Sequence, residues 1–131
     1  MESRNTKQKV AIGEAFREAA RPLSPDEVLE IARHTYPALG IATIYRNIQA
    51  MLADGRLQAV EMPGDASRYE LTGKEHHDHF HCNLCDRIYD LEGTTAPIKM
   101  ALPLGFRLTG HEYFFRGTCS DCLSGKNQSQ N

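Results

Sequence analysis

Hydrophobic and polar positions alternate with helical periods along the first half of the chain. The first apolar stripe repeats every three or four residues, through Ile12, Ala15, Phe16 and Ala19. A second helix is predicted to begin at Ser24-Pro25-Asp26-Glu27, a capping box with proline at the first helical position, over which Leu23 and Val28 can form a hydrophobic staple. Its inward side chains are expected to be Val28, Leu29, Ala32 and Tyr36, before Pro37 ends it. The pattern therefore predicts two short amphipathic helices.

A third helix is predicted from Ile41 to Asp54, with Gly55 just past its end. Its core stripe comprises Ile41, Ile44, Ile48, Met51 and Leu52. At about 100° per residue, Arg46 falls nearly opposite this stripe and Tyr45 lies at its border. The residues around Arg46 are small or can hydrogen-bond: Ala42, Thr43 and Gln49. Such a face can approach the major groove of DNA as a recognition helix does, but the stripe by itself fits an ordinary exposed helix with a surface arginine even better.

Short alternating runs at 57–62 and 67–71 flank Pro63-Gly64-Asp65-Ala66 and predict a β-hairpin after the third helix. Three helices followed by a hairpin are the elements of a winged helix. Thr72-Gly73-Lys74-Glu75 is predicted to be a hinge, because the composition then changes abruptly to histidine, cysteine and acidic residues.

Beyond the hinge the sequence predicts a smaller α/β unit. Its elements are a strand at Ile88–Leu91, a short helix at Pro97–Leu102 and a strand at Phe106–Thr118. The aromatic run Tyr113-Phe114-Phe115 is expected in a core or a dimer interface rather than in a separate binding patch. The expected class is α+β, with a first domain at 1–71, a hinge at 72–75, a second domain at 76–123 and a disordered polar tail at 124–131.

Composition narrows the class of protein. Two domains within 131 residues must each have a small core, so we expect an additional stabilising cross-link such as a metal site. No apolar run approaches the roughly 20 residues of a membrane span and the first residues do not resemble a signal peptide, so we expect a cytoplasmic protein without a membrane partner. The net charge of −2 divides into +1 over residues 1–60, with eight basic and seven acidic side chains, and −3 over residues 61–131, with seven and ten. This asymmetry is too weak to indicate DNA binding by itself.

The four cysteines form two pairs, Cys82-x-x-Cys85 and Cys119-x-x-Cys122. In a protein expected to be cytoplasmic, this spacing favours thiolate metal ligands over disulfides. Each pair can converge on one ion, so the two pairs predict a tetrahedral structural Zn²⁺ that holds the ends of the α/β unit together. With four thiolates and no open coordination position, this ion is not expected to be catalytic. Redox dithiols or buried free thiols are the alternative.

Four of the six histidines lie between Glu75 and Cys82. Alternation in an extended segment would divide this stretch between two faces, one with His77, His79 and His81 and the other with His76, Asp78 and Cys82. The residues elsewhere that can complete two sites are Glu70, Asp90, Glu92 and His111. Nitrogen and oxygen ligands without thiolate suit Fe²⁺, Mn²⁺ or Zn²⁺ and do not discriminate among them. A solvated histidine run is the alternative, which the interleaved aspartate and adjacent cysteines disfavour.

Two other functions fit parts of this pattern. A zinc hydrolase could use the histidine cluster as an open site with Glu70 or Glu75 as base, but the chain has no His-Glu-x-x-His motif and no obvious oxyanion hole. A metal-carrying or scaffold module would bind protein instead of DNA, and it predicts that Arg46 is dispensable.

These stretches together resemble the Fur family, the ferric-uptake-type metalloregulators that include zinc-uptake and peroxide-sensing relatives. The resemblance covers nearly all of residues 5–123. Its motifs are Leu39-Gly-Ile-Ala-Thr-Ile-Tyr-Arg46, Arg68-Tyr-Glu-Leu71, His76-His-Asp-His79, the two Cys-x-x-Cys pairs and Phe106-Arg-Leu-Thr-Gly-His111. It implies a winged-helix DNA-binding domain hinged to an α/β dimerisation domain. The expected protein is a homodimeric repressor that binds palindromic double-stranded operator DNA when a regulatory divalent metal is bound, with a peroxide-sensing Fe/Mn-dependent repressor as the alternative.

The resemblance also assigns roles to residues. It matches the four cysteines to a structural zinc site and matches Tyr45 and Arg46, beside Thr43, to DNA contacts. The regulatory metal site would comprise Glu70, His77, His79 and Asp90. A second metal site would comprise His76, Asp78, His111 and an acid from the following segment, for which we choose Glu92.

Two features depart from the family pattern. The DNA-binding half usually contributes a histidine to the regulatory site just before the second helix, but here that stretch is Arg21-Pro22-Leu23-Ser24. His34, further along that helix, is one candidate substitute, although its spacing differs. The amino terminus is also short, starting where relatives often have an extra basic helix. DNA affinity is therefore expected to be lower or to rest on Arg4, Lys7 and Lys9 instead.

Overall fold

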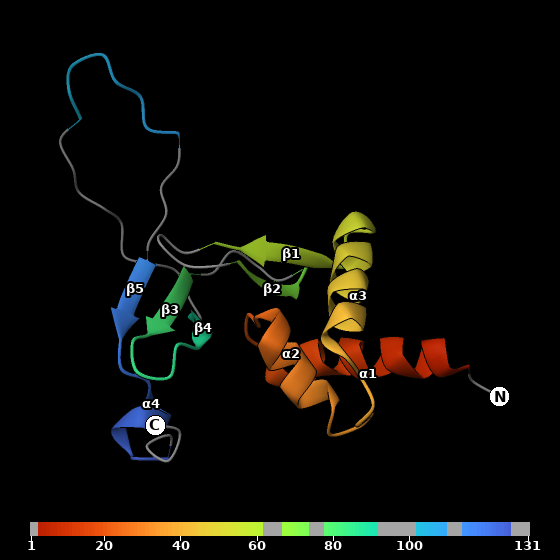
Figure 1. The fold of residues 1–131 in the computed structure, drawn as a ribbon. Coiled ribbons are helices and arrows are strands. Elements are labelled where there is room, and N and C mark those ends of the chain that lie inside the picture. The colour runs from red at the N-terminus through yellow and green to blue at the C-terminus, as the bar shows by residue number, and fades with distance from the viewer. Residues whose placement is uncertain (1–2, 62–66, 74–77, 92–101, 110–113, 127–131) are drawn as a thin grey trace. The chain divides into compact units, whose positions relative to one another are not determined.

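The computed structural model describes residues 3–61, 67–73, 78–91, 102–109 and 114–126. The chain divides into two units, Met1–Lys74 and Glu75–Asn131, each with its own internal contacts. The first unit holds three helices and a two-stranded sheet, and the second holds a three-stranded sheet and a short helix (Figure 1). The predicted α+β class is confirmed. Within the described residues, no helix has both the length and the apolar character needed to cross a membrane.

Three helices with defined starts form most of the first unit: α1 (Arg4–Ala19), α2 (Pro25–Ala32) and α3 (Ile41–Ala53). The predicted capping box is confirmed, because the Ser24 side chain accepts from the Glu27 backbone N–H and the Glu27 carboxylate accepts from the Ser24 backbone N–H. Such a box satisfies two donors that the first helical turn leaves unpaired. Ser3 caps α1 in a similar way, by accepting from the Thr6 N–H.

The apolar stripes of the three helices meet in one core. Its buried members are Ala11, Ile12, Ala15, Phe16, Leu23, Val28, Ala32, Leu39, Ile44, Ile48, Met51 and Leu57. Two expectations were wrong. Ile41 is 37% exposed, because it occupies the first position of α3, where no preceding helical turn lies beside it to cover its side chain. Helix α2 ends at Ala32, after which the His34 and Thr35 N–H groups donate to carbonyls three residues back, although Tyr36 still packs on the core.

The predicted hairpin follows α3. Strands β1 (Leu57–Val60) and β2 (Arg68–Leu71) pair antiparallel. A pairing that the sequence did not suggest joins this hairpin to the segment before α2: Leu23 and Tyr69 exchange two backbone hydrogen bonds of 2.8 and 2.9 Å. The hairpin is therefore attached to the helices by main-chain bonds as well as by the core.

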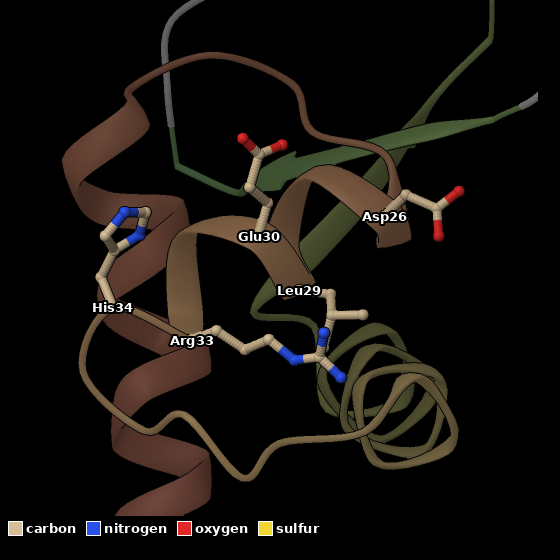
Figure 2. A pocket seen from close by; sticks show the side chains of 5 residues that line it. All are labelled: Asp26, Leu29, Glu30, Arg33 and His34. Carbon is tan, nitrogen blue, oxygen red and sulfur yellow. The ribbon is translucent and has the colours of Figure 1, made fainter.

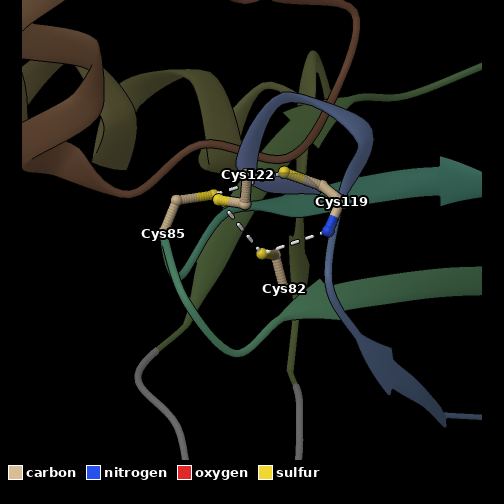
Figure 3. A group of neighbouring side chains, drawn as sticks. All are labelled: Cys82, Cys85, Cys119 and Cys122. Carbon is tan, nitrogen blue, oxygen red and sulfur yellow. Dashed lines mark hydrogen bonds between the residues drawn. The ribbon is translucent and has the colours of Figure 1, made fainter. Parts of the chain in front are cut away.

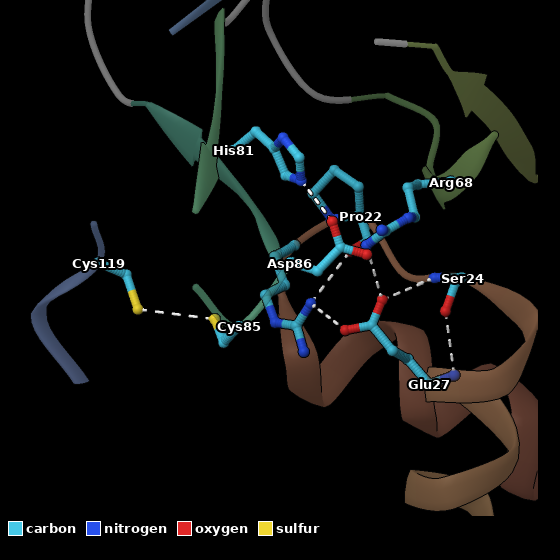
Figure 4. Close-up of polar contacts among 9 residues, drawn as sticks. Pro22, Ser24, Glu27, Arg68, His81, Cys85, Asp86 and Cys119 are labelled. Carbon is cyan, nitrogen blue, oxygen red and sulfur yellow. Dashed lines mark hydrogen bonds and ion pairs between the residues drawn. The ribbon is translucent and has the colours of Figure 1, made fainter. Parts of the chain in front are cut away.

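Glu27 connects the start of α2 to the hairpin. Its carboxylate accepts from Arg21 Nη1 at 2.9 Å and from Arg68 Nη1 at 3.1 Å, in addition to its bond with the Ser24 N–H (Figure 4). Arg68 is nearly buried, with 6% of its side chain exposed, and the Glu27 side chain is 20% exposed. One carboxylate thus serves both as a helix cap and as the counter-ion of two guanidinium groups.

Replacing Glu27 by glutamine is expected to destabilise the first unit by about 2 kcal/mol, because hydrogen bonds to charged groups are worth roughly 1.5–3 kcal/mol each when poorly solvated. The measurement is urea unfolding of the full chain followed by helical circular dichroism. Glu30→Gln, an exposed change on the same helix, is the control and should shift the free energy of unfolding by less than about 0.5 kcal/mol. Equal stabilities for the two variants would contradict a structural role for this carboxylate.

The second unit is built on the sheet order β4-β3-β5. Strand β3 (Asp78–Cys82) pairs antiparallel with β4 (Ile88–Leu91) and parallel with β5 (Phe114–Gly117). The strand predicted at Ile88–Leu91 is confirmed, but the one predicted over Phe106–Thr118 is too long. The Phe106 N–H donates to the Pro103 carbonyl around Gly105, whose φ of 85° turns the chain there.

Helix α4 (Ser120–Leu123) closes the second unit. Backbone bonds from Ser124, Gly125 and Lys126 continue it as turns, so these three residues are ordered where a disordered tail was expected. The short helix predicted at Pro97–Leu102 and the rest of the tail, 127–131, lie outside the described residues, except that Leu102 itself is not helical.

Candidate functional site

Four cysteine sulfurs converge at one end of the second unit (Figure 3). All four Sγ atoms lie within 4.8 Å of one another; Cys82 and Cys122 are 3.7 Å apart and Cys85 and Cys119 are 3.8 Å apart. Four sulfurs bound tetrahedrally at about 2.3 Å from a zinc ion lie about 3.8 Å from each other. The two Cys-x-x-Cys pairs therefore have the donor type and the spacing of a structural zinc site.

Hydrogen-bond donors around the cluster favour thiolate at two of the sulfurs. Burial opposes the charge on Cys82, but N–H groups of Cys85, Cys119 and Leu84 outweigh burial and lower the pKa of this thiol to about 6. Burial likewise opposes the charge on Cys119, whose pKa is nevertheless lowered, chiefly because the Tyr89 hydroxyl donates to its sulfur. Zinc binds thiolate rather than thiol, so this environment suits the metal. Burial raises the pKa of the Cys85 thiol to about 12, an effect that a bound cation would offset.

Two residues assigned to the regulatory site lie on neighbouring strands. His79 on β3 is the register partner of Asp90 on β4, and His79 Nε2 is 3.4 Å from Asp90 Oδ1. Two ligand atoms held about 2.1 Å from one ion at tetrahedral angles are about 3.4 Å apart, so these two atoms can share a metal ion. His77 lies outside the described residues, as do three members of the second site: His76, Glu92 and His111. The fourth, Asp78, is buried on β3.

Glu70, the regulatory ligand expected from the first unit, lies on β2 and is 1% exposed. Its cross-strand partner on β1 is Gln58, whose Nε2 is 3.0 Å from Glu70 Oε1. This contact was not predicted from the sequence. The register of the predicted hairpin could have suggested it, because Gln58 and Glu70 lie directly opposite each other on the two strands.

The stretch before α2 does not contain the histidine that the family resemblance leads us to expect there. Pro22 is buried there, and Arg21 donates to its carbonyl as well as to Glu27. His34 lies beyond the end of α2, exposed, with Nδ1 3.2 Å from the Ile31 carbonyl. It lines an open pocket along the helix with Asp26, Leu29, Glu30 and Arg33 (Figure 2). Among the described residues, His34 belongs to no group of three ligand atoms close enough to share an ion.

The outer face of α3 presents the residues expected to contact DNA. Arg46 and Tyr45 are exposed, opposite the buried Ile44 and Ile48. Arg46 Nη2 donates to Thr43 Oγ1 at 3.0 Å, which orients the guanidinium group along the helix surface. Lys9 is exposed on α1. The amphipathic interpretation of this helix therefore holds in the folded unit, apart from Ile41.

Comparison with known proteins identifies the family of this chain. Residues 1–112 match the ferric uptake regulator family. The chain belongs to the ferric uptake regulator family. A ferric uptake regulation protein of Campylobacter jejuni is 29% identical over 126 residues, which cover 92% of this chain and 80% of that protein. One of Neisseria meningitidis serogroup A is 31% identical over 107 residues, which cover 79% of this chain and 74% of that protein.

Solved structures share the fold. A zinc-bound manganese uptake regulator superposes with a TM-score of 0.72 at 20% identity, covering 89% of this chain and 91% of its own. Membership of the ferric uptake regulator family confirms the resemblance inferred from the motifs and classes the chain as a metalloregulator. It also leaves the zinc hydrolase alternative without support.

Proposed function

We propose that this chain is a metal-dependent transcriptional repressor that binds palindromic operator DNA as a homodimer when its regulatory metal is bound. The observation that carries the proposal is the exposed face of α3, where Thr43 holds Arg46 beside Tyr45 on a helix whose other face is core. A helix buried on one side and bearing an oriented arginine on the other fits the major groove. Lys9 would add a phosphate contact from α1.

Two kinds of metal are proposed. A structural Zn²⁺ is held by Cys82, Cys85, Cys119 and Cys122, whose sulfur spacing supports it. A regulatory Fe²⁺, Mn²⁺ or Zn²⁺ is bound by Glu70, His77, His79 and Asp90, supported by the 3.4 Å spacing of His79 and Asp90. We also propose a second metal site of His76, Asp78, Glu92 and His111, on the basis of the motif resemblance.

The second unit offers a surface for the proposed dimer. Among the described strands, β5 lies at the edge of its sheet, and Phe114 and Phe115 on it are 40% and 37% exposed. All residues from 102 to 109 are exposed, and they include Leu104, Phe106 and Leu108. An apolar sheet edge exposed in a single chain supports pairing with a second copy, which would bury it.

Metal binding is proposed to favour the geometry in which both reading helices can engage one palindrome. Coupling between two sites in one protein is typically 1–3 kcal/mol, so metal should tighten operator binding by about 5- to 150-fold. The test uses a palindromic site selected by the metal-loaded protein from randomised DNA, with fluorescence anisotropy in the presence and absence of Mn²⁺, Zn²⁺ or anaerobic Fe²⁺.

His79→Ala is the matched variant for this test. It removes a proposed regulatory ligand and should leave operator affinity independent of added metal, while one zinc ion per chain remains bound to the cysteines. If the unaltered chain binds the operator with the same affinity in the absence of metal and in the presence of each of the three metals, the proposal of metal-dependent repression is wrong.

A further inference from the structure

Tyr89, on β4, contacts the cysteine cluster without belonging to either Cys-x-x-Cys pair. It is half-buried and packs against the cluster together with Phe80. These two aromatic residues are register partners on β4 and β3, so their side chains project from the same face of the sheet. The pairing of the two strands therefore holds the phenol ring next to the sulfurs.

The Tyr89 hydroxyl lies between an arginine and a sulfur. It accepts a hydrogen bond from the Arg87 side chain and donates one to Cys119 Sγ. A hydroxyl that itself accepts a hydrogen bond is polarised and donates more strongly. At Cys82, by contrast, the N–H donors belong to the main chain. Tyr89 thus supplies a side-chain donor that a single substitution can remove.

The hydrogen bond also joins the two cysteine pairs. Tyr89 lies on the strand that follows Cys82-x-x-Cys85, whereas Cys119 is the first cysteine of the second pair. Loss of a metal ion requires a thiolate to move away from it. The hydroxyl opposes this movement for Cys119, because it holds the sulfur in place even when the sulfur is not bound to metal.

A donor to a ligand sulfur also affects the charge of the site. Four thiolates carry more negative charge than one Zn²⁺ ion neutralises. A hydrogen bond to one of the sulfurs stabilises this excess charge. Removing such a partner of a metal ligand typically weakens metal binding by about 10- to 100-fold.

We propose that Tyr89 is a positioning residue of the structural zinc site, whose hydroxyl holds Cys119 and slows the loss of the metal. The inference rests on the proposed four-cysteine site. It adds a residue to which the cysteine pattern assigns no role.

The experiment compares Tyr89→Phe with the unaltered full chain, because this change keeps the ring and removes only the hydroxyl. Zinc transfer to a chromogenic chelator should become about tenfold faster or more, as expected for a partner of a metal ligand. With Co²⁺ in place of Zn²⁺, the sulfur-to-cobalt charge-transfer band should move to lower energy, because a sulfur without its donor gives up an electron more easily. Tyr69→Phe, the same change in the first unit, should alter neither measurement.

Arg87→Met tests the same chain of hydrogen bonds from one step further away. It removes the donor to the Tyr89 hydroxyl and should move the cobalt band in the same direction by a smaller amount. This variant decides the question alone if Tyr89→Phe takes up no cobalt, and an unmoved band would then overturn the proposal.

Two results for Tyr89→Phe would each overturn the proposal while leaving the zinc site intact. A cobalt band at the position of the unaltered chain means that the hydroxyl does not act on the sulfur. A zinc transfer rate equal to that of the unaltered chain means that the hydrogen bond does not hold the metal. If the unaltered chain itself retains no zinc and gives no tetrahedral cobalt spectrum, the four-cysteine site fails instead.

Discussion

Cys82→Ser is expected to abolish zinc binding and unfold the second unit while the first stays folded. Cys82 is fully buried and its sulfur is 3.7 Å from that of Cys122; in the described part of this unit, Cys82, Cys119 and Cys122 form a buried cluster with Phe80, Cys85 and Tyr89 packed against it. A small domain whose buried cluster is built on thiols depends on a metal ion for much of its stability. Structural zinc contributes about 10–16 kcal/mol in small metal-bound domains, and a serine hydroxyl does not replace the thiolate.

The measurement combines zinc content per chain with a two-dimensional amide NMR spectrum. Zinc should fall from about one per chain to near zero, and dispersed signals should disappear for the second unit only, because the first has a separate core. Asn83→Ser changes an exposed residue between Cys82 and Cys85, and this variant should keep both its bound zinc and its dispersed NMR signals. A Cys82→Ser chain that keeps its zinc and its dispersed signals would contradict the four-cysteine site.

Arg46→Ala is expected to weaken operator binding about 30-fold or more without changing stability. The side chain is exposed, so its removal leaves no cavity, and its contact with Thr43 is a surface hydrogen bond. A well-placed arginine contact to a base is worth about 1–3 kcal/mol, and a homodimer on a palindrome would lose two of them. The check is the dissociation constant for the selected operator, measured with metal present, together with the thermal midpoint.

Arg17→Ala provides the control for charge, because it removes an exposed arginine from α1 of the same unit. We expect Arg17→Ala to reduce operator affinity only slightly, by the amount that the loss of one distant positive charge causes. An Arg46→Ala protein that binds the operator as tightly as Arg17→Ala would favour the alternative of a metal-carrying scaffold that does not use this helix for DNA.

Local sequence patterns predicted most of the elements. The helix starts at Ser24 and Ile41, the hairpin and the strand at Ile88–Leu91 depend on neighbours a few residues away, and the structure contains each of them. The spacing within each Cys-x-x-Cys pair also determines local geometry, since it brings two sulfurs together within one tight turn. The four-cysteine cluster could therefore be expected before any coordinates.

The sequence alone determined the periodic faces, the caps, the metal-binding residue types and the family. Tertiary structure decided which distant residues meet. Glu27 is shared with Arg68 41 positions away, Gln58 faces Glu70 across the hairpin, and β5 pairs parallel with β3 on the side opposite β4. The physical reason is that caps and periods are set by the backbone geometry of neighbouring residues. Contacts between distant segments depend instead on how the buried faces pack, which no short stretch of sequence encodes.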